Sequence, residues 1–436
     1  MTGRTILYAA LVAALALPAC GRQKASNVTA PPPPARSLKS PGCSSVTYGG
    51  PGRPQFLIAA STTLQGQFTD HGVQAAQALK LALAKRRWRA GPYRVGLQVC
   101  DETTAKSDFS DPRKCRSNAR AFADNRAVLA VVGPIFSSCA AQMLPILDRV
   151  RGGPLAVVGA STTYLGLTRG GPGVGPAEPA VYYPRKLRNF IRLVPADDVQ
   201  GAAAAIYVKK RGASRAFVLT DKDPYGEGLG AAFRTAAGRI GLTVAGTRRW
   251  RPNAHDYRAL AAHVRAARPD AVLLAGYAFE NAARLLKDVR AALPKAQIIG
   301  GDGMYQAGAI AEGAGAAAEN FAATIAIVPA TALPPAGRAF ANDFRRRFGA
   351  FPCCFSVAHA EAAGMVLDAI ATSRGSRRKV LASLLHARVN GGLTGDFYID
   401  RFGDTSLTRM GVYRVVQGKT HFDAAISPPA NLLSRR

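Results

Sequence analysis

The sequence VLAVVGPIFSSCAAQMLPILDRV, residues 128–150, contains the pattern on which the fold prediction depends. It begins with five consecutive apolar residues, 128–132, and this uninterrupted run predicts a strand that is covered on both faces. A turn of small and hydroxyl-bearing residues follows at 133–139, and residues 140–150 have the length and composition of a crossover helix. The stretch therefore predicts one strand, turn and helix of a parallel sheet.

The same alternation extends in both directions from this stretch, starting at residue 55. Runs that predict strands are 56–60, 95–99, 128–132, 155–158, 216–220, 271–275 and 297–299. Runs that predict helices are 74–84, 112–123, 140–150, 201–210, 230–240, 257–267 and 281–291. Later runs predict a strand at 321–328, helices at 336–348 and 357–373, and strands at 393–400 and 410–416. Because 436 residues exceed what one core usually supports, we predict an α/β fold of two Rossmann-like lobes with parallel sheets.

The chain carries a large excess of positive charge, with 57 Lys+Arg against 27 Asp+Glu and a formal charge of +30. Such a surface attracts polyanions. The basic residues nevertheless occur in short scattered groups, such as 86–87, 345–347 and 377–379, and form no single arm or stripe. We therefore expect no nucleic-acid partner, whereas contact with an anionic membrane or cell wall stays open.

The N-terminus predicts export. Arg4 precedes an apolar run at 6–17, which is shorter than the about 20 residues that span a bilayer and fits a signal peptide over 1–19. The run ends in LPACG, residues 17–21, which resembles a bacterial lipobox except at Pro18. We expect a lipid on Cys20, with an ordinary cleaved signal peptide as the alternative. Residues 20–54 are rich in Pro, Ser and Gly and predict an extended tether above the membrane.

The seven cysteines fit an oxidising compartment. Once Cys20 is set aside, an even number remains for disulfides, namely Cys43, Cys100, Cys115, Cys139, Cys353 and Cys354. Their spacing does not give the pairing, although two of Cys100, Cys115 and Cys139 could meet because they lie in successive segments. No Cys/His spacing typical of zinc sites is present, so no metal is expected.

The turns that follow the predicted strands carry the candidate binding residues, because ligands of open parallel sheets bind beyond the carboxyl ends of the strands. The turns at 133–139 (GPIFSSC) and 159–163 (GASTT) bring hydroxyl groups to helix N-termini, where they can receive a carboxylate; simple capping is the alternative for each. The turn at 300–303 (GGDG) places Asp302 where it can hold an ammonium ion. Asp221 and Asp223 indicate a helix start in preference to a metal site.

Short stretches in a fixed order carry a further signal: 132–133 through 137–138, 160–162 with 167–168, 191–192 with 197–198 and 200–201, 223–228, 276–277, 301–303, and 403–404 with 412–413. Each is weak alone, but their order and spacing are specific. Over residues 55–419 the chain resembles the leucine/isoleucine/valine-binding family of periplasmic binding proteins, the type I solute-binding proteins of ABC importers.

This resemblance implies a fold in which the chain crosses between the lobes three times, near Ala196, Ile327 and Ser406. Lobe 1 would comprise residues 55–195 plus 329–405, and lobe 2 residues 196–328 plus 406–424. Residues 425–436 would form a C-terminal tail.

The resemblance also implies roles for individual residues. Ser137 and Thr162 would bind a ligand carboxylate, with Ser138 in the same turn. The Ala160 carbonyl and Asp302 would bind its ammonium group. Tyr225 and Tyr277 would close over the ligand from lobe 2. The family's first loop usually reads Ser-Gly-Pro, whereas residues 63–68 here are TLQGQF, so the side-chain end of the pocket departs from the family.

Together these observations predict an extracytoplasmic, lipid-anchored solute-binding protein of an ABC importer that binds an amino acid or a similar small molecule. Its partners would be ABC permease subunits, and we expect a monomer. A sensing receptor of the same fold, coupled to signalling, is the alternative. The sequence has no P-loop, no Gly-x-Ser-x-Gly elbow and no His-Glu-x-x-His motif, so we expect neither enzymatic activity nor a cofactor.

Overall fold

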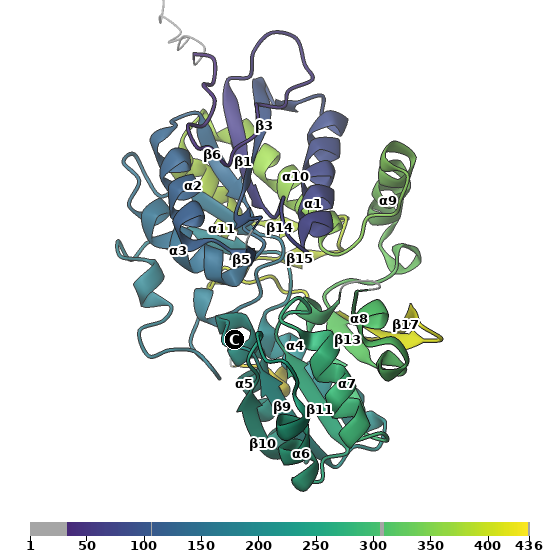
Figure 1. Ribbon diagram of the computed structural model, residues 1–436. Helices are drawn as coiled ribbons and strands as arrows, with labels where there is room; N and C mark the ends of the chain where they lie inside the picture. Colours follow the sequence, from purple (N-terminus) through teal and green to yellow (C-terminus); the bar gives the residue numbers. More distant parts are fainter. Residues whose placement is uncertain (1–32, 106, 306–308, 435–436) are drawn as a thin grey trace, which may run out of the picture. The chain divides into compact units, whose positions relative to one another are not determined.

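The computed structural model describes residues 33–105, 107–305 and 309–434. From residue 34 onward they form one compact unit. This unit contains two α/β domains, each built on its own large sheet (Figure 1). The predicted α/β class with two parallel-sheet domains is therefore confirmed. The predicted signal peptide, 1–19, and the predicted lipidation site Cys20 lie outside the described residues.

The first domain is built on six strands in the order β2-β3-β1-β6-β7-β8, and all neighbours except β2 and β3 are parallel. Successive residues of β1 face opposite sides: Leu57 belongs to the core shared with α2 and α3, and Ile58 to the core shared with α1 and α10. Because helices cover both faces, these strands can be apolar throughout. The elements of this segment are β1 (Phe56–Thr62), α1 (Thr69–Lys85), β2 (Arg89–Ala90), β3 (Tyr93–Asp101), β4 (Thr103–Thr104), β5 (Ser107–Ser110), α2 (Pro112–Asp124), β6 (Val128–Val132), α3 (Ser137–Asp148), β7 (Ala156–Gly159) and β8 (Phe190–Arg192).

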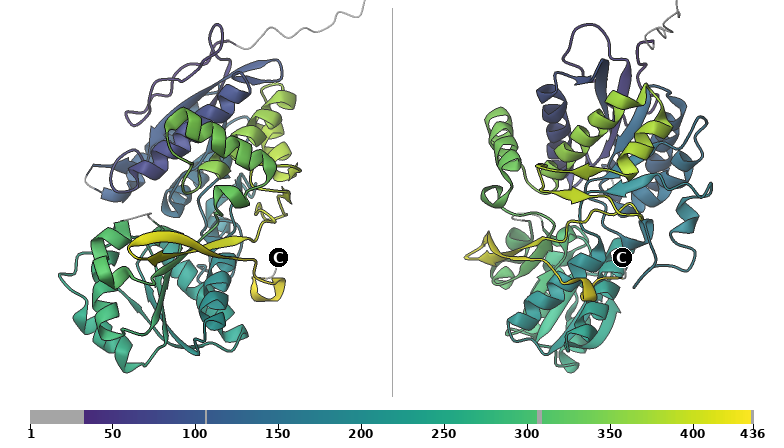
Figure 2. Two further views of the ribbon diagram at one scale, coloured as in Figure 1. Left: turned by 90° about the vertical axis from the view of Figure 1, so that its right-hand side faces the viewer. Right: turned by 180° about the vertical axis from the view of Figure 1, so that it is seen from behind.

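The second domain is built on seven strands in the order β10-β9-β11-β12-β13-β16-β17. Strands β9 to β13 are parallel, whereas β16 and β17 run antiparallel at one edge, where Figure 2 shows them in yellow. Helices α4 and α5 share a core with one face, and α6 and α7 with the other. The elements are α4 (Asp197–Lys210), β9 (Arg215–Thr220), α5 (Pro224–Arg239), β10 (Thr243–Arg249), α6 (Arg258–Ala266), β11 (Ala271–Ala275), α7 (Ala282–Ala292), β12 (Gln297–Gly300), α8 (Ala309–Ala314), β13 (Ala322–Ile325), β16 (Met410–Val416) and β17 (Lys419–Ile426).

The chain passes between the two sheets three times: between β8 and β9, after β13, and before β16. After β13 it returns to the first domain, where three helices contribute to the core on one face of the first sheet; the second and third of them contact its strands, and the first packs on the second. The returning elements are α9 (Pro335–Phe348), α10 (Ser356–Ser373) and α11 (Arg377–Leu385), followed by a small two-stranded sheet of β14 (Arg388–Val389) and β15 (Phe397–Tyr398).

A buried network of charges joins two of these passages. Arg192, at the end of β8, donates through Nε to Asp404 Oδ1 at 2.8 Å, and Arg169 Nε lies 3.1 Å from Asp404 Oδ2. Arg169 also pairs with Asp198 of α4 at 3.0 Å. Burial alone would raise the pKa of Asp404, but the charges of Arg192 and Arg169 lower it overall. Ion pairs thus hold the passages together. Removal of either partner of a pair would be strongly destabilising, because it would leave the other charge buried without a partner.

The sequence analysis missed β8, β10, β17 and α11, and it also missed the short elements β2, β4, β5, β14 and α8. The strands β10 and β17 lie at the two edges of the second sheet and are largely half-buried or exposed, so they lack an apolar run. The predicted strand at 393–400 is wrong over most of its length, because only Phe397–Tyr398 pairs with another strand. Residues 392 and 395 are glycines, and Gly395 has a positive φ of 121°, which interrupts an extended run.

The predicted tether at 20–54 is wrong for its described part. Leu38 is buried, and Cys43 forms a disulfide with Cys100 of β3. Thr47 N donates to the carbonyl oxygen of Leu97 at 2.7 Å. The segment therefore covers the part of the β3 edge that β2 leaves open, because a disulfide and backbone pairing hold it there.

A second disulfide joins Cys115 of α2 to Cys139 of α3. The prediction that two of Cys100, Cys115 and Cys139 meet is confirmed, whereas Cys353 and Cys354 form no disulfide with any other described residue.

The C-terminal segment packs against the second domain. Leu432 and Leu433 are buried, and Arg239 of α5 donates to the carbonyl oxygens of Asn431 at 3.1 Å and Leu433 at 3.0 Å. Within the described part of the chain, no helix is both long and apolar enough to span a bilayer.

Candidate functional site

A small cavity of about 30 Å³ lies between the two domains. Its walls come from loops at the carboxyl ends of strands in both sheets and from the start of α1 and α10, where ligands of such sheets usually bind. The lining residues are Phe68, His71, Ile135, Phe136, Ser137, Ser161, Thr163, Tyr225, Tyr277, Asp302, Gly303, Cys354, Phe355 and His359.

Asp302 is the acidic group of the cavity. It follows β12 at the start of a 3-10 turn, and its side chain is buried. Burial raises the pKa of Asp302, while hydrogen bonds from Tyr225 and Gln200 act in the opposite direction. Its Oδ1 has no hydrogen-bond partner among the described residues. An ionised carboxylate in this position therefore needs a positively charged or hydrogen-bonding partner from outside the chain.

Glycine at position 303 lets the ends of β11 and β12 approach closely. A Cβ on Gly303 would lie 2.4 Å from the carbonyl oxygen of Gly276 and 3.0 Å from a ring carbon of Tyr225. The backbone N of Gly303 donates to the Tyr225 hydroxyl at 3.1 Å. Tyr225 is thereby fixed beside Asp302.

A second buried carboxylate makes this wall still more favourable for a cation. Asp197, the first residue of α4, is fully buried. Burial raises the pKa of Asp197 well above its ordinary value, and the negative charge of Asp302 raises it further. Two neighbouring carboxylates do not both ionise easily without a positive charge nearby. An ammonium group at Asp302 would supply that charge.

Hydroxyl groups line the opposite wall. Ser137 is the first residue of α3, and its Oγ accepts a hydrogen bond from Tyr164 N at 3.2 Å, so the hydroxyl proton is free to be donated. Ser161 Oγ donates to the carbonyl oxygen of Ile135 at 3.3 Å. Of the described residues that line the cavity, none is Lys or Arg. An anion here would be bound by hydroxyl groups and by the partial positive charge of the α3 N-terminus.

Glu102, which sequence reasoning missed, positions this hydroxyl wall. Its buried carboxyl group accepts hydrogen bonds from the backbone N of Ile135 at 3.1 Å, the backbone N of Phe136 at 2.9 Å and the Ser61 hydroxyl at 2.8 Å. Burial raises the pKa of Glu102 to about 7 despite these hydrogen bonds. The group fixes the backbone that enters α3 and thereby fixes Ser137.

Aromatic rings from both domains fill the space around the cavity. Phe136 lies 5.2 Å from Tyr277, Phe68 lies 5.3 Å from Phe279, and Phe109 lies 4.7 Å from Phe279 between ring centroids. Tyr277 and Phe279 are stacked at 5.2 Å. The edge-to-face contacts between these rings join the two domains across the cavity.

The structure brings four of the predicted ligand residues together in the cavity wall: Ser137, Tyr225, Tyr277 and Asp302. The other three do not line it. Thr162 points back towards Gly159, since a Cβ on that glycine would lie 2.2 Å from Thr162 Oγ1.

Ser138 Oγ lies 3.1 Å from Ser110 Oγ, and Ala160 is buried in a separate apolar cluster. In the second hydroxyl turn it is Ser161 and Thr163 that face the cavity. Neighbouring turn residues point in different directions, and the sequence does not show which of them faces inward.

Two histidines of the cavity wall were not predicted as site residues. His71 lies in the first turn of α1, and His359 lies in α10. Burial lowers the pKa of each to about 4, so both imidazoles are neutral at ordinary pH. No sequence motif identifies either histidine as a site residue, because the two helices that contain them are far apart in the sequence.

The interpretation of Asp223 as a helix-start residue is confirmed. It is the N-cap of α5, and its Oδ1 accepts a hydrogen bond from Tyr225 N at 2.9 Å. This cap helps to place Tyr225 at the cavity.

Comparisons with known proteins agree with this architecture. The family model described as periplasmic binding protein matches residues 57–420. The Leu/Ile/Val-binding protein BraC3 of Rhizobium johnstonii is 26% identical over 274 residues, which are 62% of this chain and 67% of BraC3.

Solved structures share the fold at low sequence identity. The leucine binding protein LivK of Thermotoga maritima superposes with a TM-score of 0.73 at 24% identity, covering 86% of this chain and 99% of LivK. A solute binding protein of an R. palustris ABC transporter, solved with benzoate, has a TM-score of 0.68 at 18% identity and covers 86% of this chain and 96% of its own.

Proposed function

The chain belongs to the periplasmic binding protein family, and from this premise we propose that it binds an α-amino acid or a similar zwitterion between its two domains. The relatives are solute-binding proteins and not enzymes. One observation carries the choice of ligand. Asp302 presents a buried oxygen without a partner among the described residues to a cavity whose other wall holds Ser137 at a helix N-terminus.

Both charges of an amino acid find suitable partners in this arrangement. Removing a zwitterion from water is costly unless each charge gains hydrogen bonds. The ammonium group would bind Asp302, near Asp197. The carboxylate would accept a hydrogen bond from Ser137 and lie at the N-terminus of α3. Tyr225 and Tyr277 would close over the ligand.

The volume of the cavity implies that binding requires movement. A cavity of about 30 Å³ has room for about two water molecules, which is less than any amino acid needs. Aromatic rings such as those of Phe136 and Tyr277 occupy the remaining space between the two domains. The domains must therefore separate for the ligand to enter, and the ligand would then favour the closed arrangement by binding it more strongly.

The proposal extends to the cellular role. A family member of this kind would deliver its solute to ABC permease subunits as a monomer outside the cytoplasm, attached to the membrane by a lipid on Cys20. A receptor of the same fold that reports the ligand to a signalling partner is the alternative. Uptake of the identified solute by cells with and without the gene separates the two, because only transport requires the solute to cross the membrane.

A thermal-shift screen tests the binding proposal. A ligand at about 100 times its Kd stabilises the folded protein by about 2.7 kcal/mol, which raises the melting temperature. The screen should contain amino acids, the same compounds without the amino group, and aromatic carboxylates. We expect amino acids to raise the melting temperature and their des-amino analogues to do so much less. A shift caused only by compounds without an amino group would refute the proposal.

A further inference from the structure

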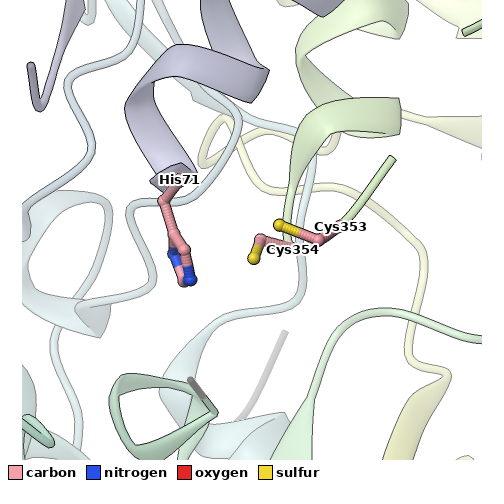
Figure 3. A group of neighbouring side chains, drawn as sticks. All are labelled: His71, Cys353 and Cys354. Carbon is pink, nitrogen blue, oxygen red and sulfur yellow. The ribbon is translucent and has the colours of Figure 1, made fainter. Parts of the chain in front are cut away.

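Two adjacent cysteines and a histidine meet beside the proposed ligand cavity. Cys353 and Cys354 lie in the turn before α10, and the imidazole of His71 faces them from the start of α1 (Figure 3). One nitrogen and two sulfur atoms from these residues all lie within 4.8 Å of one another. Neither cysteine forms a disulfide within the part of the chain that the structure describes. Three donor atoms from distant parts of the sequence thus meet at one point.

Their spacing is close to that of a tetrahedral metal site. With metal–sulfur bonds of about 2.3 Å and metal–nitrogen bonds of about 2.0 Å, neighbouring ligand atoms stand about 3.5 to 3.8 Å apart. Because the ligand atoms lie within 4.8 Å of one another, each pair would have to approach by at most about 1.3 Å on binding. Rotation of the short cysteine side chains can supply this movement.

The backbone holds the two thiols next to His71. Cys353 N donates to Gln74 Oε1 at 2.8 Å, which fixes the cysteine turn to α1 one turn after His71. Ser356 N donates to the carbonyl oxygen of Cys353 at 3.1 Å and closes the turn. Cys354 has φ of 57°, in the left-handed region. A residue other than glycine adopts it at a cost of order 1–3 kcal/mol, and such strain is concentrated at functional sites.

A further polar group in the same cavity wall lacks a partner. His359 Nδ1 lies 2.9 Å from the carbonyl oxygen of Phe355, so this nitrogen carries the proton. Its Nε2 is buried and has no hydrogen-bond partner among the described residues. Buried polar atoms are rarely left unpaired in folded proteins, and an ion with a bound water molecule would supply the missing partner.

We propose that His71, Cys353 and Cys354 bind a thiophilic divalent ion of the Zn²⁺ type, with the fourth coordination position open towards the cavity and His359. Two thiolates neutralise the charge of such an ion. Sulfur and imidazole donors select it over Mg²⁺ or Ca²⁺, which require oxygen ligands. The sequence predicted no metal because most of the chain separates His71 from the two cysteines.

Titration with Cd²⁺ under reducing, anaerobic conditions tests the site without any amino acid present, so its outcome is independent of the proposed ligand. A Cd²⁺–thiolate bond gives a charge-transfer absorption in the ultraviolet that no carboxylate or imidazole site produces. We expect one equivalent to bind the purified full chain. C353S and C354S should each reduce the absorption, because each leaves one thiolate, and the double variant C353S/C354S should abolish it. H71Q should weaken binding by more than about 100-fold, because about 100-fold is the upper end for loss of an outer-shell partner and His71 would be a direct ligand.

The matched control is H255Q, because the side chain of His255 is 99% exposed and lies outside the cavity wall. It should bind Cd²⁺ as the unaltered chain does. Circular dichroism establishes that each variant is folded. The proposal is overturned if the reduced unaltered chain shows no charge-transfer absorption. It is equally overturned if the double variant C353S/C354S retains the absorption, because the thiolates would then come from opened disulfides.

Discussion

Replacing Asp302 by asparagine should weaken amino-acid binding while leaving the free protein at least as stable. The substitution keeps the size of the side chain and its hydrogen-bond acceptor but removes the charge. Loss of one partner of a buried, hydrogen-bonded charge pair costs about 2–5 kcal/mol, and the retained acceptor favours the lower end. At about 1.4 kcal/mol for each tenfold change in Kd, the affinity should fall by about 30-fold.

The free protein should respond differently. Burial raises the pKa of Asp302 because its charge is poorly compensated in the absence of ligand. A neutral amide avoids that cost, so the melting temperature of ligand-free D302N should equal or exceed that of the unaltered chain. If D302N binds the amino acid more weakly but is at least as stable as the unaltered chain, misfolding cannot explain the weaker binding.

Isothermal titration calorimetry with an amino acid and its des-amino analogue provides the assay. In the unaltered chain, removal of the ligand's amino group should greatly weaken binding, whereas in D302N the two compounds should bind with similar affinity. D256N is the control, since Asp256 pairs with Arg258 at the surface, away from the cavity. If D302N discriminates between the two compounds as strongly as the unaltered chain, the ammonium site has been assigned incorrectly.

Three further predictions concern pH and stability. Because burial raises the pKa of Asp302 in the free protein and a bound ammonium group would lower it, binding should release a proton. The affinity for the amino acid should then rise with pH between the pKa of Asp302 in the bound state and its pKa in the free state. Calorimetry in buffers of different ionisation heat measures the protons exchanged on binding, and proton uptake or no proton exchange would contradict this prediction. D404N leaves Arg192 buried without its carboxylate and should lower the free energy of unfolding by about 3–5 kcal/mol in urea at neutral pH. Folding lowers the pKa of Asp404, so the stabilisation by its ion pairs is fully present above the unfolded-state pKa. It is lost as the pH falls through the folded-state pKa. If D404N lowered the free energy of unfolding equally at strongly acid pH, the ion pair would be contradicted. Joint replacement of Cys115 and Cys139 by serine opens a loop with a sequence separation of 24 and should lower the free energy of unfolding by about 3.5 kcal/mol, whereas an unchanged denaturation midpoint would show that the bond does not form.

Most of the central parallel strands could be predicted because helices enclose them on both faces. Val128–Val132 and Ala271–Ala275 have the predicted bounds, since a strand covered by helices on each side is apolar at every position. The edge strands β10 and β17 carry no such run. Their place in the sheet follows from pairing with a neighbour and not from the composition of their own residues.

The candidate site could be predicted in part for the same reason. Because ligands bind beyond the carboxyl ends of parallel strands, the turns containing Ser137 and Asp302 were natural candidates, and both line the cavity. The choice of Thr162 over Ser161 and Thr163 depends on backbone angles within one turn. The sequence does not determine those angles.

The remaining wall comes from contacts between distant segments. His71 at the start of α1 and His359 in α10 meet only because the chain returns to the first domain with α9, α10 and α11. The pairing of Cys43 with Cys100 similarly depends on the path of an N-terminal segment that composition alone assigned to a tether. Such contacts are properties of the folded chain and have no local sequence pattern.

A crystal structure of the chain with the amino acid that gives the largest thermal shift would test the central claim most directly. We predict that the ligand lies between the two domains, with its ammonium group within hydrogen-bond distance of Asp302 and its carboxylate at the Ser137 hydroxyl and the N-terminus of α3. A ligand bound in the reverse orientation, or at a place that contacts neither residue, would contradict the account.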